Sequence, residues 1–132
     1  HILVAEDVKL NMDIVTYILE HEGAEVICAK DGETALRLFS ESAEGSIDLI
    51  LMDIRMPGIN GYEAAERIRA MKRSDADIPI IAMTANVYEE DIERAKRAGM
   101  NDHLAKPMDS GKLLAMAGAY CAGRGQLMDE QY

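Results

Sequence analysis

Carboxylate side chains follow two apolar runs of this sequence, at the points where strands would end. Glu6 and Asp7 come directly after ILVA, and Asp53 comes directly after LILM. Thr84 closes a later apolar run, and Lys106 follows another. Gathered carboxylates can hold a divalent cation. These residue types indicate a metal site if the fold brings them together.

Five short apolar runs predict strands that are buried on both faces of a sheet. They cover residues 2–5, 26–29, 49–52, 78–83 and 103–105. Helical patterns lie between them, and the clearest is an apolar stripe with spacings of three and four, formed by Leu10, Ile14, Val15, Ile18 and Leu19. Strands alternating with helices predict parallel βαβ units with right-handed crossovers. The fold class is therefore α/β, with helices covering both faces of the sheet.

The expected helices carry their own start and stop signals. Gly23 and Gly99 stand where helices should end. Asp31, Asn60 and Asp109 stand where helices should begin, and their side chains can accept hydrogen bonds from the first turn. These signals support the alternating pattern.

The strand ends should lie together at one edge of the sheet. In an open α/β sheet, ligands bind beyond the carboxyl ends of the strands, near the point where the strand order reverses. Three carboxylates, a hydroxyl and an ammonium should therefore converge there from widely separated positions of the chain.

Length and composition describe one compact domain. The chain has 132 residues, of which 48% are hydrophobic and 29% charged, as is typical of soluble globular proteins. Its formal net charge of -10 would repel a phosphate backbone, which argues against nucleic-acid binding by this chain alone. Cys28 and Cys121 lack CxxC or histidine-rich neighbours, so neither a disulfide framework nor a zinc site is expected.

The sequence also predicts a location and a boundary. No apolar run approaches the length that crosses a bilayer, and the first residues do not resemble a secretory signal. We therefore expect a cytoplasmic domain that does not itself contact a membrane, although a parent protein could be membrane-bound. The chain starts directly in a strand without an initiator Met, which suggests a piece of something longer. We expect a domain at residues 1–120 and a tail or linker at residues 121–132, where periodicity is lost.

Taken in order, the polar residues resemble the receiver domain of bacterial two-component signalling. The resemblance rests on the acidic pair Glu6 and Asp7, on Asp53, and on the Thr-Ala and Lys-Pro steps that begin at Thr84 and Lys106. It runs from Ile2 to about Tyr120. It implies a flavodoxin-like (βα)5 sheet with strand order 2-1-3-4-5 and a cis bond between Lys106 and Pro107.

The resemblance also implies a role for each polar residue. Asp53 would accept the phosphoryl group, and Mg²⁺ would neutralise the anions. Asp7, Asp53 and the backbone carbonyl of Arg55 would bind the metal directly, and Glu6 would bind it through a water. Lys106 and Thr84 would contact phosphoryl oxygens. In this sense a receiver catalyses its own phosphorylation and dephosphorylation.

Three further positions can be interpreted in two ways, either by the role that the receiver family gives them or as ordinary surface residues. Arg55 and Asn86, two residues beyond Asp53 and Thr84, either tune water access to the acyl phosphate or are simply exposed loop residues. His103 stands where the family commonly has Tyr or Phe as the partner of Thr84 in switching. It is either a switch or a surface histidine at the start of a strand.

Two other functions compete with a receiver. A Mg²⁺-dependent phosphatase of the haloacid dehalogenase type also uses an Asp nucleophile, but it needs a second Asp two residues later as general acid. Arg55 stands there and cannot donate a proton. A nucleotide-binding module would need a glycine-rich loop after the first strand, where VAEDVKLN stands instead.

The local runs resemble the receivers of hybrid histidine kinases in particular. These runs are MDIRMPGINGYEAAERIR, IPIIAMTAN and AGMNDHLAKPMD. A stand-alone receiver and the front of a DNA-binding regulator remain alternatives. The phosphoryl partner would be a histidine on a kinase core or on a histidine phosphotransfer domain. The resemblance also suggests a homodimer through the fourth helix, fifth strand and fifth helix.

Overall fold

The computed structural model describes the backbone of residues 1–85 and 88–129, and the side-chain surroundings of residues 1–85 and 88–121. Five strands form one sheet: β1 (Ile2–Ala5), β2 (Val26–Ala29), β3 (Leu49–Asp53), β4 (Ile80–Thr84) and β5 (Asp102–Ala105). All neighbouring strands are parallel, in the order β2-β1-β3-β4-β5. The predicted fold class and strand order are therefore confirmed.

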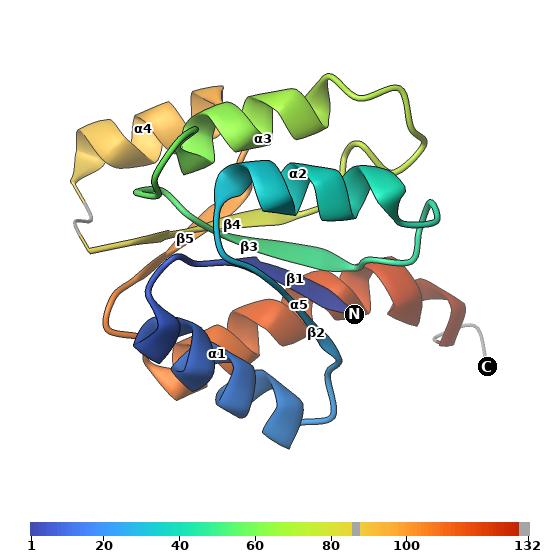
Figure 1. Cartoon of the computed structure of the whole chain (residues 1–132). Helices are drawn as coiled ribbons and strands as arrows, with labels where there is room; N and C mark the ends of the chain where they lie inside the picture. Colours follow the sequence, from blue (N-terminus) through green and yellow to red (C-terminus); the bar gives the residue numbers. More distant parts are fainter. Residues whose placement is uncertain (86–87, 130–132) are drawn as a thin grey trace.

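In the described part of the chain, five helices cover the sheet on both faces. They are α1 (Lys9–His21), α2 (Gly32–Glu41), α3 (Gly61–Arg69), α4 (Glu89–Arg97) and α5 (Ser110–Asp129). Helices α2, α3 and α4 lie on one face, and α1 and α5 lie on the other (Figure 1). The chain is a three-layer sandwich with the sheet in the middle.

The sheet separates two apolar cores. Ile50 and Met52 pack under α2, α3 and α4, whereas Leu49 and Leu51 pack under α1 and α5. All four side chains are fully buried. Because successive side chains of a strand point to opposite faces, a strand covered on both sides needs a continuous apolar run. Each such side chain contributes about 1.5–3 kcal/mol relative to exposure.

The helix ends follow the sequence signals. Asp31 Oδ1 accepts a hydrogen bond from the Thr34 backbone N–H at 2.7 Å, and Asn60 Oδ1 accepts one from the Glu63 N–H at 2.9 Å. Asp109 caps α5 in the same way. Strand β4 starts later than predicted because Pro79 has no N–H to donate. Its carbonyl still accepts from the Ile50 N–H at 3.0 Å.

Helix α5 continues to Asp129, past the position where periodicity fades. Gly123 and Gly125 disfavour a helix, which explains why the sequence did not predict one there. The division into a domain and a linker at residue 121 stays a prediction. Within the described part of the chain, no helix has the length and apolar character needed to cross a membrane.

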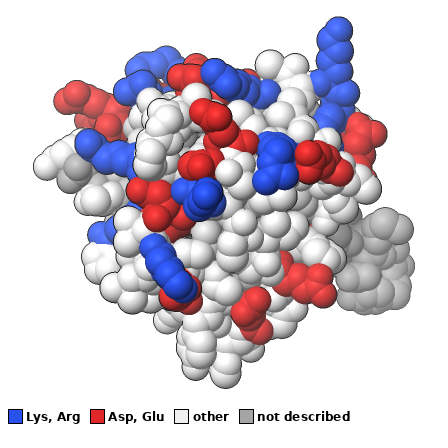
Figure 2. All heavy atoms as spheres, in the orientation of Figure 1, with Lys and Arg blue, Asp and Glu red and all other residues white. Residues whose placement is uncertain are grey.

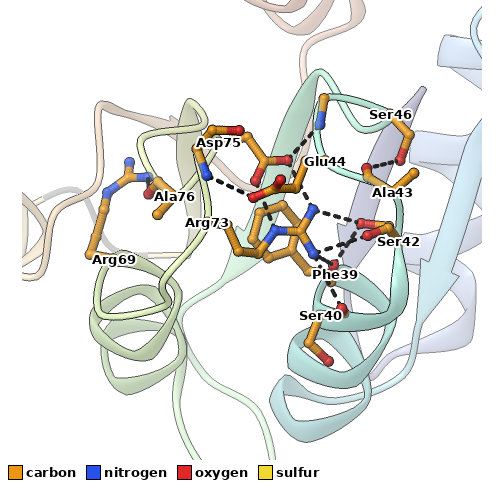
Figure 3. Close-up of polar contacts among 12 residues, drawn as sticks. Phe39, Ser40, Ser42, Ala43, Glu44, Ser46, Arg69, Arg73, Asp75 and Ala76 are labelled. Atoms are coloured by element: carbon orange, nitrogen blue, oxygen red, sulfur yellow. Dashed lines mark hydrogen bonds and ion pairs between the residues drawn. The ribbon is translucent and has the colours of Figure 1, made fainter.

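A polar network that the sequence did not reveal closes the end of α2 (Figure 3). The Arg73 guanidinium lies over the Phe39 ring, with Cζ 4.3 Å from its centroid, and donates to the Phe39 carbonyl at 2.6 Å and the Ser42 carbonyl at 3.0 Å. It also donates two bonds to the buried carboxylate of Asp75, at 2.8 and 3.0 Å. Arg73 thereby satisfies carbonyls that a helix end leaves without partners.

Candidate functional site

The carboxyl ends of β1, β3, β4 and β5 form one edge of the sheet, and the predicted site residues lie there. Ala5 pairs with Met52 in the β1–β3 register, so Glu6 and Asp53 are the next residues along these neighbouring strands. Strand order reverses at β1, which is flanked by β2 and β3. This is the place where an α/β sheet opens a ligand site.

Three carboxylates cluster at this edge. Oxygens of Glu6, Asp7 and Asp53 all lie within 4.8 Å of one another. Glu6 and Asp53 are buried, with 2% and 4% of their surfaces exposed, whereas Asp7 is exposed. Hard cations with oxygen preference bind such sets, so the donor atoms fit Mg²⁺.

Lys106 joins the cluster from the loop after β5. Its Nζ donates to Asp53 Oδ2 at 2.8 Å and lies 2.8 Å from Glu6 Oε1. Burial alone would lower the pKa of Lys106, but the two carboxylates outweigh burial and raise it. The ammonium therefore stays charged and offsets part of the negative charge. The peptide bond between Lys106 and Pro107 is cis, as predicted.

The two buried carboxylates differ in how firmly they hold a proton. Burial, with help from the nearby Glu6, raises the pKa of Asp53 to about 6, although Lys106 acts in the opposite direction. Burial also acts to raise the pKa of Glu6, but the Lys106 ammonium and the Val8 N–H outweigh it and lower that pKa. The Val8 N–H donates to Glu6 Oε2 at 3.1 Å. Glu6 is thus the more firmly ionised member of the pair.

Backbone geometry fixes the end of β3. The Arg55 N–H donates to Asp53 Oδ1 at 3.2 Å, and the Gly61 N–H donates to the Ile54 carbonyl at 2.9 Å. A Cβ on Gly61 would lie 2.4 Å from the Asp53 carbonyl oxygen, which is closer than atoms approach. Only glycine allows α3 to start this close to the strand. Gly61 was not predicted as a site residue, although the Asn-Gly step at the start of α3 was a signal.

A cleft opens beside the acidic edge, with a volume of about 580 Å³. It is lined by Asp7, Ile54, Arg55, Met56, Pro57, Asn60, Tyr62, Thr84, Asp91 and Arg94. Thr84 is buried at the end of β4, and Arg55 is exposed. Tyr62, Asp91 and Arg94 were not predicted, because nothing local in the sequence shows that α3 and α4 meet at this cleft.

The remaining predicted positions lie elsewhere or are not described. His103 pairs with Ala82 in the β4–β5 register, and its side chain is 33% exposed. It lines a separate groove of about 800 Å³ along β5 and α5, together with Lys112 and Tyr120. Asn86 falls outside the described residues. The structure thus unites Glu6, Asp7, Asp53, Thr84, Arg55 and Lys106 at one edge and places His103 on the neighbouring face.

Known proteins with similar sequences indicate the family of this chain. A family model described as the response regulator receiver domain matches residues 2–118. The hybrid signal transduction histidine kinase I of Dictyostelium discoideum is 40% identical over 82% of this chain, which spans 6% of that protein. The sensor protein GacS of Pseudomonas syringae pv. syringae is 35% identical over 85% of this chain, which spans 12% of it. The chain therefore matches only a small part of these two proteins.

A solved structure shows the same arrangement of elements. The receiver domain of a sensor histidine kinase from Pseudomonas aeruginosa PAO1 is 36% identical, with a TM-score of 0.82. The match covers 92% of this chain and 96% of that one. In that crystal structure a magnesium ion is coordinated in the active site cleft.

Proposed function

The chain belongs to the response regulator receiver domain family, and we propose that it accepts a phosphoryl group on Asp53 with Mg²⁺ as cofactor. One observation carries the proposal. The buried Asp53 carboxylate lies 2.8 Å from Lys106 Nζ, groups with Glu6 and Asp7 within 4.8 Å, and stands beside an open cleft. Such a site can neutralise the negative charge of the attacking Asp53 carboxylate and still admit a phosphoryl donor through the cleft.

The reaction transfers a phosphoryl group between two nucleophiles. An Asp53 carboxylate oxygen attacks phosphorus, a P–O bond forms, and the P–N bond to the donor imidazole breaks. The imidazole leaves with the electron pair and takes up a proton. Lys106 supplies a positive charge to the phosphoryl oxygens and the Thr84 hydroxyl supplies a hydrogen bond, so both stabilise the developing charge.

The residues at the edge divide the work of holding Mg²⁺. Asp7, Asp53 and the Arg55 carbonyl would bind the ion, which when bound neutralises the repulsion between carboxylate and phosphoryl oxygens. Glu6 would act through a water. In support, the buried Glu6 carboxylate is held at the cluster by the Lys106 ammonium, 2.8 Å from Oε1, and by the Val8 N–H, 3.1 Å from Oε2.

The partner that donates the phosphoryl group would dock on α1. This helix begins two residues after Asp7. Leu10 and Ile14, which the sequence pattern grouped with the buried Val15 and Leu19, are instead exposed, and together with Tyr17 they form an exposed apolar stripe. Leu10 and Tyr17 are 67% and 70% exposed. In the view of Figure 2, the surface over α1 and α5 carries fewer charged side chains than the surface over α2, α3 and α4. A spacing of four and three residues suits packing against a partner helix that carries a phosphohistidine.

We assign the parent protein to the hybrid histidine kinases, since a relative at 40% identity is a hybrid signal transduction histidine kinase and a solved structure at 36% identity is the receiver domain of a sensor histidine kinase. A stand-alone or DNA-binding response regulator is the alternative context. The haloacid dehalogenase-like phosphatase is not supported, because the position of its general acid is held by the exposed Arg55.

Intact mass spectrometry after incubation with acetyl phosphate and Mg²⁺ tests the function. The wild type should gain one phosphoryl group, and Asp53→Asn should gain none. Asp48→Asn, at the opposite edge of the sheet before β3, should behave as the wild type does. Equal incorporation by the wild type and Asp53→Asn would refute the assignment.

A further inference from the structure

Helix α4 is attached to the domain by few buried side chains. Its sequence, EEDIERAKR, contains only two apolar residues, and among Glu89–Arg97 only Ala95 is buried. Ala98 and Met100, just beyond its last turn, are buried as well. The apolar attachment of α4 therefore lies toward its C-terminal end.

That C-terminal end is also held by a guanidinium. Arg69, the last residue of α3, donates two hydrogen bonds to the Gly99 carbonyl, at 2.9 and 2.7 Å. The same side chain donates to the Ile78 carbonyl at 2.6 Å and to Asn101 Oδ1 at 2.9 Å. Arg69 thus ties the end of α4 to the start of β4 and to the turn before β5. Charge-assisted bonds of this kind make a firm attachment.

The part of α4 from Asp91 to Arg94 has a different attachment, which depends on Tyr62 of α3. The Arg94 guanidinium lies over the Tyr62 ring, with Cζ 4.3 Å from its centroid. The Tyr62 hydroxyl donates to the Asp91 carbonyl at 3.4 Å, a long hydrogen bond.

The space around this contact is open on two sides. Tyr62 and Arg94 line both the cleft beside Asp53, of about 580 Å³, and a second cavity between α3 and α4, of about 280 Å³. Tyr62 itself is buried, with 5% of its surface exposed, and it follows Gly61, which is pressed against the Asp53 backbone. One end of the contact is therefore fixed to the phosphoacceptor strand, and the other end belongs to a helix with room to move.

We propose that Tyr62 is a releasable latch for α4, acting at Asp91 and Arg94, and that Arg69 is the pivot about which α4 turns. A phosphoryl group in the cleft adds negative charge beside Arg94, and a charge pair is stronger than a cation–π contact. The phosphorylated state therefore draws Arg94 from the Tyr62 ring and favours the turned helix, which gives the two states different interaction energies. This last step rests on the proposed phosphorylation of Asp53, whereas the latch itself does not.

Amide hydrogen exchange resolved by NMR, without any phosphoryl donor, tests the latch. Tyr62→Phe removes the hydroxyl and keeps the ring, and Arg94→Gln removes the cation. Each should speed exchange of the Asp91–Arg97 amides about threefold to tenfold. The amide of Asn101 beside the pivot, which donates to the Ile80 carbonyl of β4, and the amides of α2 should stay unchanged. Arg37→Gln, which breaks an ordinary exposed pair with Glu41 on α2, is the matched control and should leave α4 unchanged.

The possible outcomes are distinct. If amide exchange in α4 is unchanged in both Tyr62→Phe and Arg94→Gln, the proposed latch is wrong. It is also wrong if exchange accelerates equally in every helix, because Tyr62 would then only stabilise the core. A second arm adds beryllofluoride and Mg²⁺, which mimic the phosphoryl group. The wild type should then exchange faster in α4, and the two variants should show a smaller further change. If the first arm succeeds and the second shows no effect on the wild type, the latch stands and its coupling to phosphorylation is rejected.

Discussion

The positive charge of Lys106 offsets part of the negative charge of the buried Glu6 and Asp53 carboxylates. The remaining charge determines which ions the site can bind. With one ammonium against Glu6, Asp7 and Asp53, the edge keeps an excess of negative charge. Like charges this close repel unless a cation joins them. The excess negative charge therefore favours binding of a metal cation. Substituting one residue at a time should show what each contributes to metal binding.

Asp7 is the exposed member of the cluster and the clearest test of metal binding. Mg²⁺ should raise the melting temperature of the wild type by mass action, because the ion binds the folded state. Asp7→Ala should lose most of that rise, as followed by thermal unfolding across a Mg²⁺ titration. Asp13→Ala, which removes an exposed carboxylate from α1, should keep the full response. A Mg²⁺ response in Asp7→Ala equal to that of the wild type would exclude Asp7 as a ligand.

Asp75 is a residue through which acid pH should lower the stability of the fold. Its two hydrogen bonds from Arg73 lower the pKa of Asp75 from 3.8 to about 2, against the opposing effect of burial. A carboxyl with a lowered folded-state pKa stabilises the fold above its unfolded pKa, and this contribution of about 2 kcal/mol is lost as pH falls from about 4 to about 2.

Urea unfolding of the wild type and Asp75→Asn measures this contribution. The variant should be less stable by about 2 kcal/mol near neutral pH, and the difference should shrink as pH falls below about 4. Asp77→Asn, an exposed carboxylate of the same loop, is the control and should show a small difference at every pH. A gap for Asp75→Asn that stays constant down to about pH 3 would contradict the coupling to Arg73.

At the scale of elements, the close approach of α3 to β3 positions the acceptor loop. Gly61→Ala would place a Cβ 2.4 Å from the Asp53 carbonyl oxygen, so the helix start or the strand end must shift. We expect a loss of about 2 kcal/mol or more in stability and slower phosphorylation, because the loop that carries Arg55 moves with it.

Gly118→Ala is the matched control for this prediction. Gly118 lies in α5 with no atom within 4 Å of an added Cβ, so the same substitution should stabilise the protein by up to about 1 kcal/mol. Thermal or urea unfolding compares the two variants. Similar effects of the two substitutions would show that the contact at Gly61 is not the cause.

Elements that depend on local signals were predictable from the sequence, and contacts between distant elements were not. Asp31 and Asn60 cap helices through residues three positions away, so the sequence contains both partners of each bond. The strand-end residues could be grouped because parallel strands share an edge. Tyr62 and Arg94 meet only because α3 and α4 pack side by side, and Arg73 reaches Phe39 across 34 positions of the chain. Contacts between such distant residues leave no periodic pattern in the sequence, so they could not be predicted from it.

At the scale of the whole molecule, the apolar stripe of α1 is the expected docking surface for a phosphohistidine partner. Tyr17→Glu puts a charge where a partner helix would pack, and truncating a central aromatic contact typically costs more than 1 kcal/mol. Transfer from a phosphorylated histidine kinase core or phosphotransfer domain should therefore fall about tenfold or more. Phosphorylation by acetyl phosphate should not change, since Tyr17 does not line the cleft.

A control on another helix separates docking from surface charge. The control variant is Arg37→Glu, because Arg37 is exposed on α2. It should leave the rates of both phosphorylation reactions unchanged. If Tyr17→Glu slowed neither reaction, α1 would not be the docking surface. The homodimer through α4, β5 and α5 and the switching role of His103 stay predictions.

The chemical identity of the phosphorylated residue tests the proposed function most directly. Borohydride reduces an aspartyl phosphate to homoserine, and peptide mass mapping then locates the converted residue. After incubation with acetyl phosphate and Mg²⁺, we expect homoserine at position 53 alone, and none when Mg²⁺ is removed by a chelator. Conversion at another carboxylate, with Asp53 unmodified, would contradict its assignment as the phosphoryl acceptor.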